Sequence, residues 1–400
     1  MDNEQLPKGY KQTEVGLIPN DWEVRTLGNV GEVKMCRRIF NNETSSNGTI
    51  PFFKIGTFGK EPDAYISKEQ YDEYRKRFSF PRKGDILISA AGTIGRTIIY
   101  NGEDAYFQDS NIVWIENDFE TVSNEFLYHI YQVANYNTEG GTIQRLYNSI
   151  LKATKFKCPP KAEQTAIATA LSDADALINS LSTLIAKKRN IKQGAMQQLL
   201  KPKEGWEVKK LGEICDIFKG KGISKSQISE SGKYECILYG ELFTTYKEVI
   251  SAVVSKTNTS ESIPSKKGDI LYPGSTTTTG IDLAKASAIL KDNVLLGGDI
   301  VILRKSSYDY NPIFLSYFLN EIRRNDIAQT TKGITIHHLY GKDLAGIYAE
   351  FPSVEEQNEI ATILSDMDAE IQVLETKLEK YHKIKLGMMQ VLLTGKVRLV

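Results

Sequence analysis

The sequence predicts an α+β fold in which two similar globular domains are separated by a pair of long antiparallel coiled-coil helices, with pseudo-twofold symmetry. The main observation is an internal duplication. Residues 22–28 return at 206–212, an offset of 206 − 22 = 184, and residues 163–203 return at 356–396, an offset of 356 − 163 = 193. The second pair of segments is identical at 22 of 41 positions. Shared amphipathicity would repeat only the apolar and polar pattern, so this identity indicates a duplicated unit.

The duplication also predicts where the chain divides. A chain of 400 residues exceeds the size at which one hydrophobic core usually suffices. We expect a first globular domain at 1–158 and a second at 204–351. A central helical segment at 159–203 and a distal helical segment at 352–400 complete the chain.

Short apolar runs predict matching strands in the two globular domains. Residues 83–87 read Lys-Gly-Asp-Ile-Leu and recur at 267–271, and the strand expected at 111–115 is matched at 299–303. Phe126 opens a short helix that corresponds to the helix expected at Phe314, where the offset is 314 − 126 = 188. Residues 142–147 match 335–340 just before each long helix. Because loops tolerate changes of length better than strands do, the drifting offset indicates that surface loops differ between the copies.

The two long helices are predicted by apolar residues that alternate spacings of three and four. A capping box at 353–356 and the prolines at 159 and 160 mark where the helices begin. This rhythm is typical of a coiled-coil seam, so we expect the two helices to pack on each other. The alternative is that each helix covers its own globular domain. The seam residues are Ile167, Leu171, Ala174, Ile178, Leu181 and Ile185, and Ile360, Leu364, Met367, Ile371, Leu374 and Leu378.

The central helix carries an extra apolar row beside this seam. Leu177, Leu184 and Ile191 follow Ala170 at intervals of seven residues, whereas the distal helix places Glu370 and Lys377 in the corresponding row. A stripe this wide exceeds what one partner helix covers. We therefore expect Leu177, Leu184 and Ile191 to bind another protein, with burial by the helix's own domain as the alternative.

Composition narrows the class of protein without identifying it. Fifty acidic residues balance fifty basic ones, so no overall charge attracts the chain to nucleic acid, and any such contact must come from local clusters. The four cysteines show no paired spacing, which favours a reduced protein without a metal site. The polar N-terminus and the lack of a long apolar run predict a cytoplasmic protein that does not span a membrane.

Recognisable catalytic motifs are absent from the sequence. The four histidines form no metalloprotease motif, and neither a P-loop nor a G-x-G-x-x-G motif occurs. Asn311-Pro312 is more typical of a helix start than of a methyltransferase motif. The aspartates of the two Gly-Asp-Ile-Leu segments are more typical of turns than of catalysts. We expect no catalytic residues, no bound metal and no cofactor on this chain.

Basic and amide residues cluster at equivalent places in the two copies, although a solvated charged face is the alternative for any one cluster. Such loops combine cations that neutralise phosphates with amides that read base edges, as in a major groove. In the first domain we expect DNA contacts from Arg37, Arg38, Asn41, Arg96 and Arg145. In the second we expect them from Lys219, Lys221, Lys225, Thr276, His337 and His338.

Three features together resemble the specificity subunit of Type I restriction-modification systems. They are the segment from Gly9 to Trp22, the twin Lys-Gly-Asp-Ile-Leu segments, and the twin helices that begin Glu-Gln-x-x-Ile-Ala-Thr. The resemblance implies two target-recognition domains that each read one part of a split DNA site, with the helices as a spacer. It also implies a non-catalytic chain that joins two methyltransferase subunits, which bind S-adenosylmethionine, and two translocating nuclease subunits, which use ATP. Target-recognition domains vary within this family, so our DNA contacts depend on charge and position alone.

The helices are expected to set the distance between the two parts of the site. A helix of ~40 residues at ~1.5 Å per residue spans ~60 Å. Duplex DNA advances ~3.4 Å per base pair, so the domain centres lie at most roughly eighteen base pairs apart. The alternative function is a non-catalytic coiled-coil scaffold with two protein-binding modules. An enzyme with an unrecognised active site is a third reading.

Overall fold

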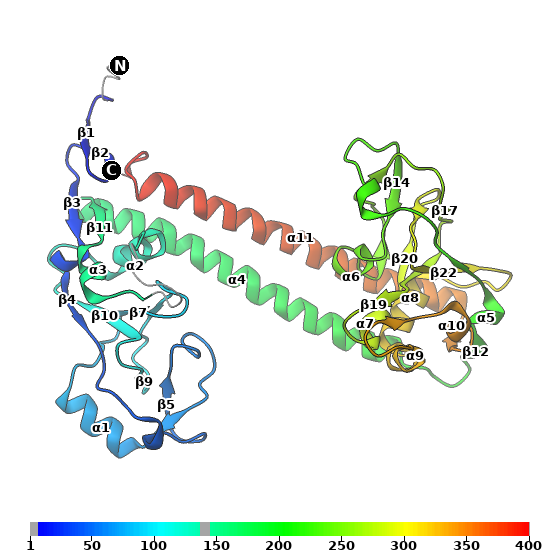
Figure 1. Cartoon of the computed structure of the whole chain (residues 1–400), viewed down its shortest axis with the longest axis horizontal. Helices are drawn as coiled ribbons and strands as arrows, with labels where there is room; N and C mark the ends of the chain where they lie inside the picture. The colour runs from blue at the N-terminus through cyan, green and yellow to red at the C-terminus, as the bar shows by residue number, and fades with distance from the viewer. Residues whose placement is uncertain (1–6, 137–144, 400) are drawn as a thin grey trace. The chain divides into compact units, whose positions relative to one another are not determined.

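The computed structural model describes residues 7–136 and 145–399, and the chain forms two compact units. Unit 1 comprises Met1–Leu181 and Lys377–Val400, and unit 2 comprises Ser182–Thr376. The two long helices are α4 (Lys161–Leu199) and α11 (Val354–Leu392), and each contributes one segment to each unit (Figure 1). Of the matched segment at 142–147, residues 142–144 lie outside the described part of the chain. Both predicted long helices are present.

Unit 1 is built on an antiparallel sheet of four strands in the order β4-β10-β7-β8. A smaller sheet has the order β6-β5-β9, and β1-β2 and β3-β11 form two-stranded pairs. The strands are β1 (Tyr10–Thr13), β2 (Gly16–Pro19), β3 (Glu23–Thr26), β4 (Gly31–Lys34), β5 (Ile50–Phe53), β6 (Tyr65–Ile66), β7 (Ile86–Ser89), β8 (Thr97–Ile99), β9 (Tyr106–Phe107), β10 (Ile112–Asn117) and β11 (Lys155–Cys158). The helices before α4 are α1 (Lys68–Arg77), α2 (Asn124–Val133) and α3 (Asn148–Ala153).

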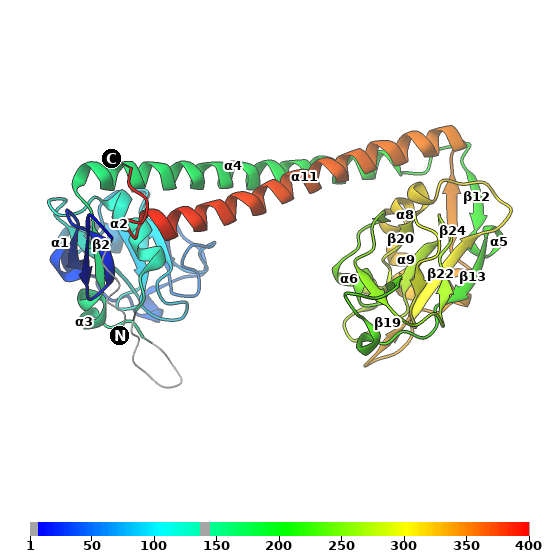
Figure 2. The ribbon, with the colours of Figure 1, turned by 90° about the horizontal axis from the view of Figure 1, so that it is seen from above.

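Unit 2 has a five-stranded sheet in the order β13-β22-β18-β20-β15 and a four-stranded sheet in the order β16-β14-β21-β17. The strands are β12 (Glu207–Lys210), β13 (Cys215–Lys219), β14 (Tyr234–Ile237), β15 (Val249–Ile250), β16 (Ser255–Thr257), β17 (Ile263–Pro264), β18 (Ile270–Pro273), β19 (Ser275–Thr276), β20 (Ser287–Ile289), β21 (Leu295–Leu296), β22 (Ile300–Lys305), β23 (His337–His338) and β24 (Tyr348–Phe351). The helices are α5 (Leu211–Ile214), α6 (Glu241–Thr244), α7 (Gly280–Leu283), α8 (Pro312–Glu321), α9 (Arg324–Thr330) and α10 (Gly341–Leu344). Figure 2 shows α11 leading directly from β24.

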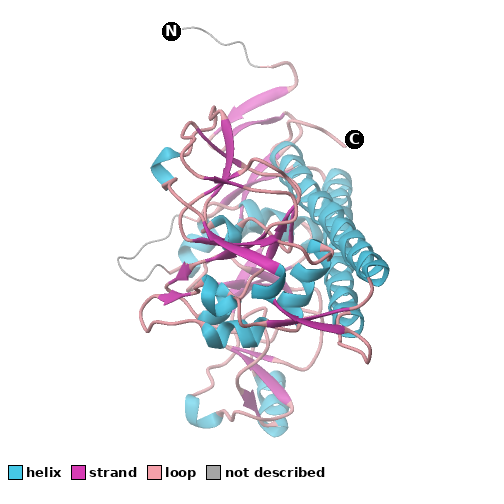
Figure 3. Cartoon of the chain, turned by 90° about the vertical axis from the view of Figure 1, so that its right-hand side faces the viewer, coloured by secondary structure: helices cyan, strands magenta, loops and turns pink. Residues whose placement is uncertain are grey.

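The predicted duplication extends to the register of the strands. In unit 1, Val113 of β10 lies opposite Ile88 of β7, and in unit 2 Val301 of β22 lies opposite Tyr272 of β18. These pairs are related by the offsets of 188 and 184 found in the sequence (301 − 113 and 272 − 88). The outer pairs β3-β11 and β12-β24 also share one register. Figure 3 shows the mixture of helices and strands that the sequence predicts.

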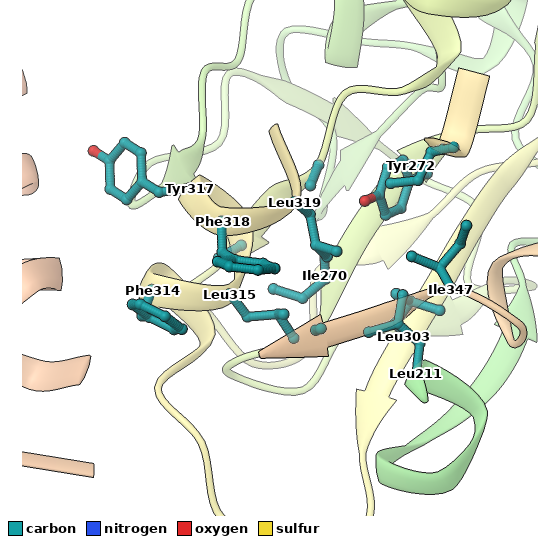
Figure 4. Close-up of a cluster of buried hydrophobic side chains, with 14 of the residues drawn as sticks. Leu211, Ile270, Tyr272, Leu303, Phe314, Leu315, Tyr317, Phe318, Leu319 and Ile347 are labelled. Atoms are coloured by element: carbon teal, nitrogen blue, oxygen red, sulfur yellow. The ribbon is translucent and has the colours of Figure 1, made fainter. Parts of the chain in front are cut away.

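The core of unit 2 lies between its five-stranded sheet and α8. Figure 4 shows Leu315, Phe318 and Leu319 of α8 facing Ile270 of β18. All four side chains are fully buried. Tyr317 points to the other side of α8 in the same view, and its hydroxyl binds Asp368 of α11. The helix α8 therefore joins the sheet to α11 within this unit.

The beginnings of the long helices pack on globular cores. Ile167 and Leu171 of α4 belong to the core of unit 1 together with Leu392 of α11, and Ile360 and Leu364 of α11 belong to the core of unit 2. At these ends, each long helix therefore covers its own globular domain, which is the alternative to helix–helix packing considered from the sequence. The fourth residue of each helix is a glutamine, at 164 and 357, whose amide donates to the carbonyl oxygen of the proline at 159 or 352, each at 2.9 Å.

Within each unit, one largely buried ion pair joins the α4 segment to the α11 segment. In unit 1, Lys385 Nζ lies 2.6 Å from Asp175 Oδ1, and in unit 2, Lys192 Nζ lies 2.6 Å from Asp368 Oδ1. The offset of 193 relates both partners (385 − 192 and 368 − 175). The lysine side chains are only 14% and 12% exposed. The same contact therefore holds the helices together in both copies.

Two further features concern the cysteines and the helices. All four cysteines are buried and free. Burial raises the pKa of the Cys36 thiol to about 12, which keeps this group protonated. Among the described residues, no helix combines the length and low charge that crossing a membrane requires.

Candidate nucleic-acid interface

One backbone arrangement supports the candidate surface of each unit. In unit 1, Ala90 donates its N–H to the carbonyl oxygen of Asn111 at 2.7 Å and accepts the N–H of Leu146 at 2.9 Å. The segment before the long helix is thereby fixed against the loop that follows β7. Ala91 and Arg145 form a β-bridge beside these bonds.

Unit 2 repeats this arrangement residue for residue. Gly274 donates its N–H to Asp299 O at 2.6 Å and accepts the N–H of Leu339 at 2.9 Å. Ser275 of β19 then pairs with His338 of β23. Arg145 and His338, which match at the offset of 193, therefore occupy equivalent positions in the two copies. This agreement locates the same surface in both units.

In unit 1, two of the five predicted residues, Arg38 and Arg145, bind the loop before β10. Arg38 Nε donates to Asp109 Oδ2 at 2.9 Å, and Arg145 Nη2 donates to the neighbouring Ser110 Oγ at 3.0 Å. Arg96 lies on the adjoining loop, where its Nη1 donates to the carbonyl oxygen of Phe58 at 2.9 Å. Arg96 also lines a pocket of about 240 Å³ with Lys60, Gly56, Gly92 and Thr93.

The other two predicted residues of unit 1 lie on neighbouring segments. The guanidinium of Arg37 lies 5.4 Å from the centre of the Phe78 ring. Asn41 is exposed at the start of the short 3₁₀ helix Asn41–Glu43, and its carbonyl accepts the Thr44 N–H. Among the described residues, no hydrogen bond joins Asn41 to the loop of Asp109.

In unit 2, the three predicted lysines line one groove. Lys219, Lys221 and Lys225 border a depression of about 1140 Å³ that also contains Tyr239, whose side chain is 40% exposed. Lys219 borders a second pocket of about 300 Å³ on its other side, together with His338 and Tyr340. The remaining two residues, Thr276 and His337, pair between β19 and β23. All six predicted residues therefore lie around one part of unit 2.

Asp299 connects these groups. Its carboxylate accepts bonds from Lys219 Nζ and Ser275 Oγ, each at 3.0 Å. Burial alone would raise the pKa of Asp299, but the bonds from Lys219 and Ser275 outweigh it and lower the pKa. The carboxylate therefore stays ionised and orients Lys219 at the mouth of both pockets.

The sequence did not single out these organising residues. Asp109, Ser110 and Asp299 were not predicted, and neither was Tyr239. Ser110 and Asp299 adopt positive φ angles of 53° and 55°. A non-glycine residue in this conformation is uncommon, but sequence alone does not reveal it. The drifting offset in this region was the one available signal, because it marks loops that differ between the copies.

The twin aspartates that follow Lys-Gly act as turn residues, as predicted. Asp85 Oδ2 accepts the N–H of Arg82 at 2.7 Å, and Asp269 Oδ2 accepts the N–H of Lys266 at 2.8 Å. Asp269 also binds Arg304 Nη2 at 2.7 Å. Within the described ranges, no group of three or more His, Cys, Asp or Glu residues is placed to hold a metal ion.

The predicted partner-binding residues of α4 are exposed. The exposed fractions are 37% for Leu177, 39% for Leu184 and 47% for Ile191. Ala170, which begins this row, packs instead against the core of unit 1. The apolar stripe therefore remains partly uncovered along the helix.

A family described as the Type I restriction modification DNA specificity domain matches residues 19–192 and 203–381. The chain belongs to this family. The predicted family is thereby confirmed, and the two matches correspond to the two copies found by duplication.

Relatives support this membership. A type I restriction enzyme specificity subunit of Haemophilus influenzae is 58% identical over 161 residues, which cover 40% of this chain and 42% of that protein. The alignment thus spans less than half the length of that relative. The MjaX specificity subunit of Methanocaldococcus jannaschii is 26% identical over 98% of this chain and 97% of its own length. The crystal structure of a type I S subunit from M. genitalium shares the fold, with a TM-score of 0.63 and 17% identity over 97% of this chain and 98% of that one.

Proposed function

We propose that the chain is the DNA-recognition subunit of a type I restriction-modification complex, and that each unit reads one half of a bipartite, asymmetric site. The observation that carries the proposal is the repeated backbone arrangement that sets Arg145 and His338 at equivalent positions beside clustered basic side chains. Side chains placed in this way reach base edges in a major groove, where all four base pairs differ.

The long helices act as the spacer in this proposal. The globular domains at 1–158 and 204–351 are joined by the helical segments 159–203 and 352–400, which pair as an antiparallel coiled coil with pseudo-twofold symmetry. The matched ion pairs Lys385–Asp175 and Lys192–Asp368 support this arrangement. A helix of 39 residues such as α4 is ~58 Å long at ~1.5 Å per residue. The two half-sites then flank several base pairs that are not read.

The chemistry is proposed to reside on companion proteins in the cytoplasm. Two methyltransferase subunits bind S-adenosylmethionine and modify adenine, and two restriction and translocase subunits use ATP. The chain itself contributes recognition and no catalytic group. The exposed row Leu177, Leu184 and Ile191 is a docking surface for the methyltransferase subunits. Burying these apolar side chains against a partner removes them from water, and this contributes hydrophobic free energy to binding.

Docking is tested with the double variant Leu177→Glu and Leu184→Glu. Charged groups at these positions would have to be desolvated in the interface, so association with the methyltransferase subunits is expected to weaken at least about tenfold. Co-purification detects the association, and titration of the chain with the methyltransferase subunits measures its affinity. The control is Val373→Glu, which alters an exposed residue of α11. Unimpaired association of the double variant would contradict the proposed surface.

DNA reading is tested with a reciprocal pair of variants. Arg37→Ala with Arg38→Ala is expected to weaken binding about tenfold and to relax base discrimination in one half-site only. Lys219→Ala with Lys221→Ala should do the same in the other half-site. The site is first defined by methylation sequencing of cells carrying the complete system, and binding is then measured on duplexes altered in either half. Equal losses at both halves would indicate sequence-independent attraction to phosphates and would contradict the proposal.

A further inference from the structure

A tight hairpin projects from the candidate surface of unit 2. Lys332 and His338 exchange backbone hydrogen bonds of 3.0 and 2.7 Å, which close the hairpin at its base. Gly333 has a φ of +119°, and a Cβ atom there would lie 1.9 Å from the carbonyl oxygen of Ile336. The turn therefore requires glycine at this position. Figure 2 shows the segment after α9 near the label β19.

The tip of this hairpin carries an uncovered apolar side chain. Ile334 is 97% exposed, the largest fraction among the large apolar side chains of the described residues. Ile336 beside it is 48% exposed. Burying an isoleucine side chain stabilises a protein, so a closed turn that exposes one to water lacks this stabilisation. The structure of the hairpin favours a partner that receives Ile334.

The surroundings of the hairpin indicate what this partner is. Its base is β23, whose His337 and His338 pair with Thr276 and Ser275 of β19. The hydroxyl of Thr278 lies 2.8 Å from that of Thr276. Thr278 donates its proton to Asp282 Oδ2 at 2.6 Å, so the groups left to meet DNA are the two histidines and the Thr276 hydroxyl, which suit base edges. Apart from Ile334 and Ile336, the hairpin residues 332–338 are polar or glycine, whereas the centre of a surface that docks another protein is apolar.

We propose that Ile334 is an apolar wedge that enters between two base pairs of the half-site read by unit 2. Proteins that bind the minor groove and insert such a side chain partly unstack the step and kink the duplex. The wedge rests on the proposed function, because it needs unit 2 to face DNA. It adds a structural readout of the DNA to the contacts already described, since steps that unstack easily accept the wedge at lower cost.

The test uses the full chain in complex with its methyltransferase subunits and a duplex that carries the bipartite site defined by methylation sequencing. The fluorescent base 2-aminopurine is placed in turn at each position of both half-sites, because its emission rises when the base unstacks. For the unaltered complex we expect one step, in one half-site, to brighten on binding. Ile334→Ala should abolish this signal and weaken binding about tenfold, and Ile334→Leu should keep both. Val208→Ala, which shortens a 56% exposed side chain on β12, should behave as the unaltered complex does.

The outcomes separate the wedge from the function on which it rests. Unchanged fluorescence and affinity in Ile334→Ala, on a site that is still bound and methylated, would overturn the wedge alone. Loss of the methyltransferase subunits from Ile334→Ala with unchanged DNA contacts would overturn it in favour of protein docking. Failure of the unaltered complex to prefer its bipartite site would overturn the proposed function itself.

Discussion

Replacing Arg398 by alanine is expected to lower the free energy of unfolding of unit 1 by about 3–5 kcal/mol, because it leaves a buried carboxylate without its cation. Glu163, at the start of α4, is fully buried. Its carboxylate accepts bonds from Arg398 Nε at 2.6 Å and from the indole N–H of Trp22 at 2.7 Å. Arg398 also binds Asp21 and lies over the Trp22 ring. One arginine therefore holds the C-terminal segment, α4 and the first strands together.

The other copy supplies the control for this prediction. Glu356 is the equivalent of Glu163, but its partner Lys203 is 56% exposed. Lys203→Ala is therefore expected to cost at most about 1 kcal/mol, since exposed ion pairs contribute little. Adding Glu163→Gln to Arg398→Ala should recover part of the loss by removing the buried charge.

The measurement is amide hydrogen exchange, which reports the stability of unit 1 and of unit 2 separately. A single melting temperature does not separate the two compact units. Equal protection of the α4 segment of unit 1 in Arg398→Ala and in the unaltered chain would contradict this account of the ion pair.

Unit 1 is also expected to lose about 3 kcal/mol of stability as the pH falls from about 6.5 to 4, through one histidine. His129 of α2 is fully buried. Burial, reinforced by the charge of Lys385, lowers its pKa from 6.5 to about 4. Below pH 6.5 the histidine of the unfolded chain binds a proton, whereas that of the folded unit binds one only near pH 4. The free energy of unfolding therefore decreases as the pH falls through this window, and the full contribution of His129 is present above pH 6.5.

The variant His129→Phe removes this titration while filling a similar volume. Carboxylates contribute to acid unfolding as well, so the measured quantity is the difference in pH dependence between the variant and the unaltered chain. Unit 2 carries Tyr317 at the equivalent position, since 317 − 129 is the local offset of 188, and its exchange should show no such step. An identical slope between pH 6.5 and 4 in His129→Phe would rule out His129 as the source.

The sequence predicts the repeated parts of this fold well, because the two copies constrain each other. The register of β7-β10 and the pair Lys385–Asp175 have counterparts at the predicted offsets. Contacts without a counterpart were not predictable. Arg398 lies beyond the matched stretch that ends at residue 396, and its partner Glu163 is 235 positions away. No local pattern records such a contact.

The candidate site shows the same division. Charge clusters at matching positions predicted that Lys219, Lys221 and Lys225 would lie together, and they line one groove. The role of Asp299 depends on a backbone conformation and on burial, which follow only from the folded chain. The exposure of Ile334 could likewise not be predicted, because an isoleucine is far more often buried than exposed.

The central claim, that helices hold two DNA-reading domains at a fixed separation, is tested most directly by lengthening the helices. Four residues, about one turn, are inserted after Ile185 in α4 and after Leu378, its equivalent in α11. The added ~6 Å corresponds to roughly one to two base pairs. Methylation sequencing should then show both half-sites unchanged and the unread gap longer by that amount. Altered half-sites with the original gap would contradict the account.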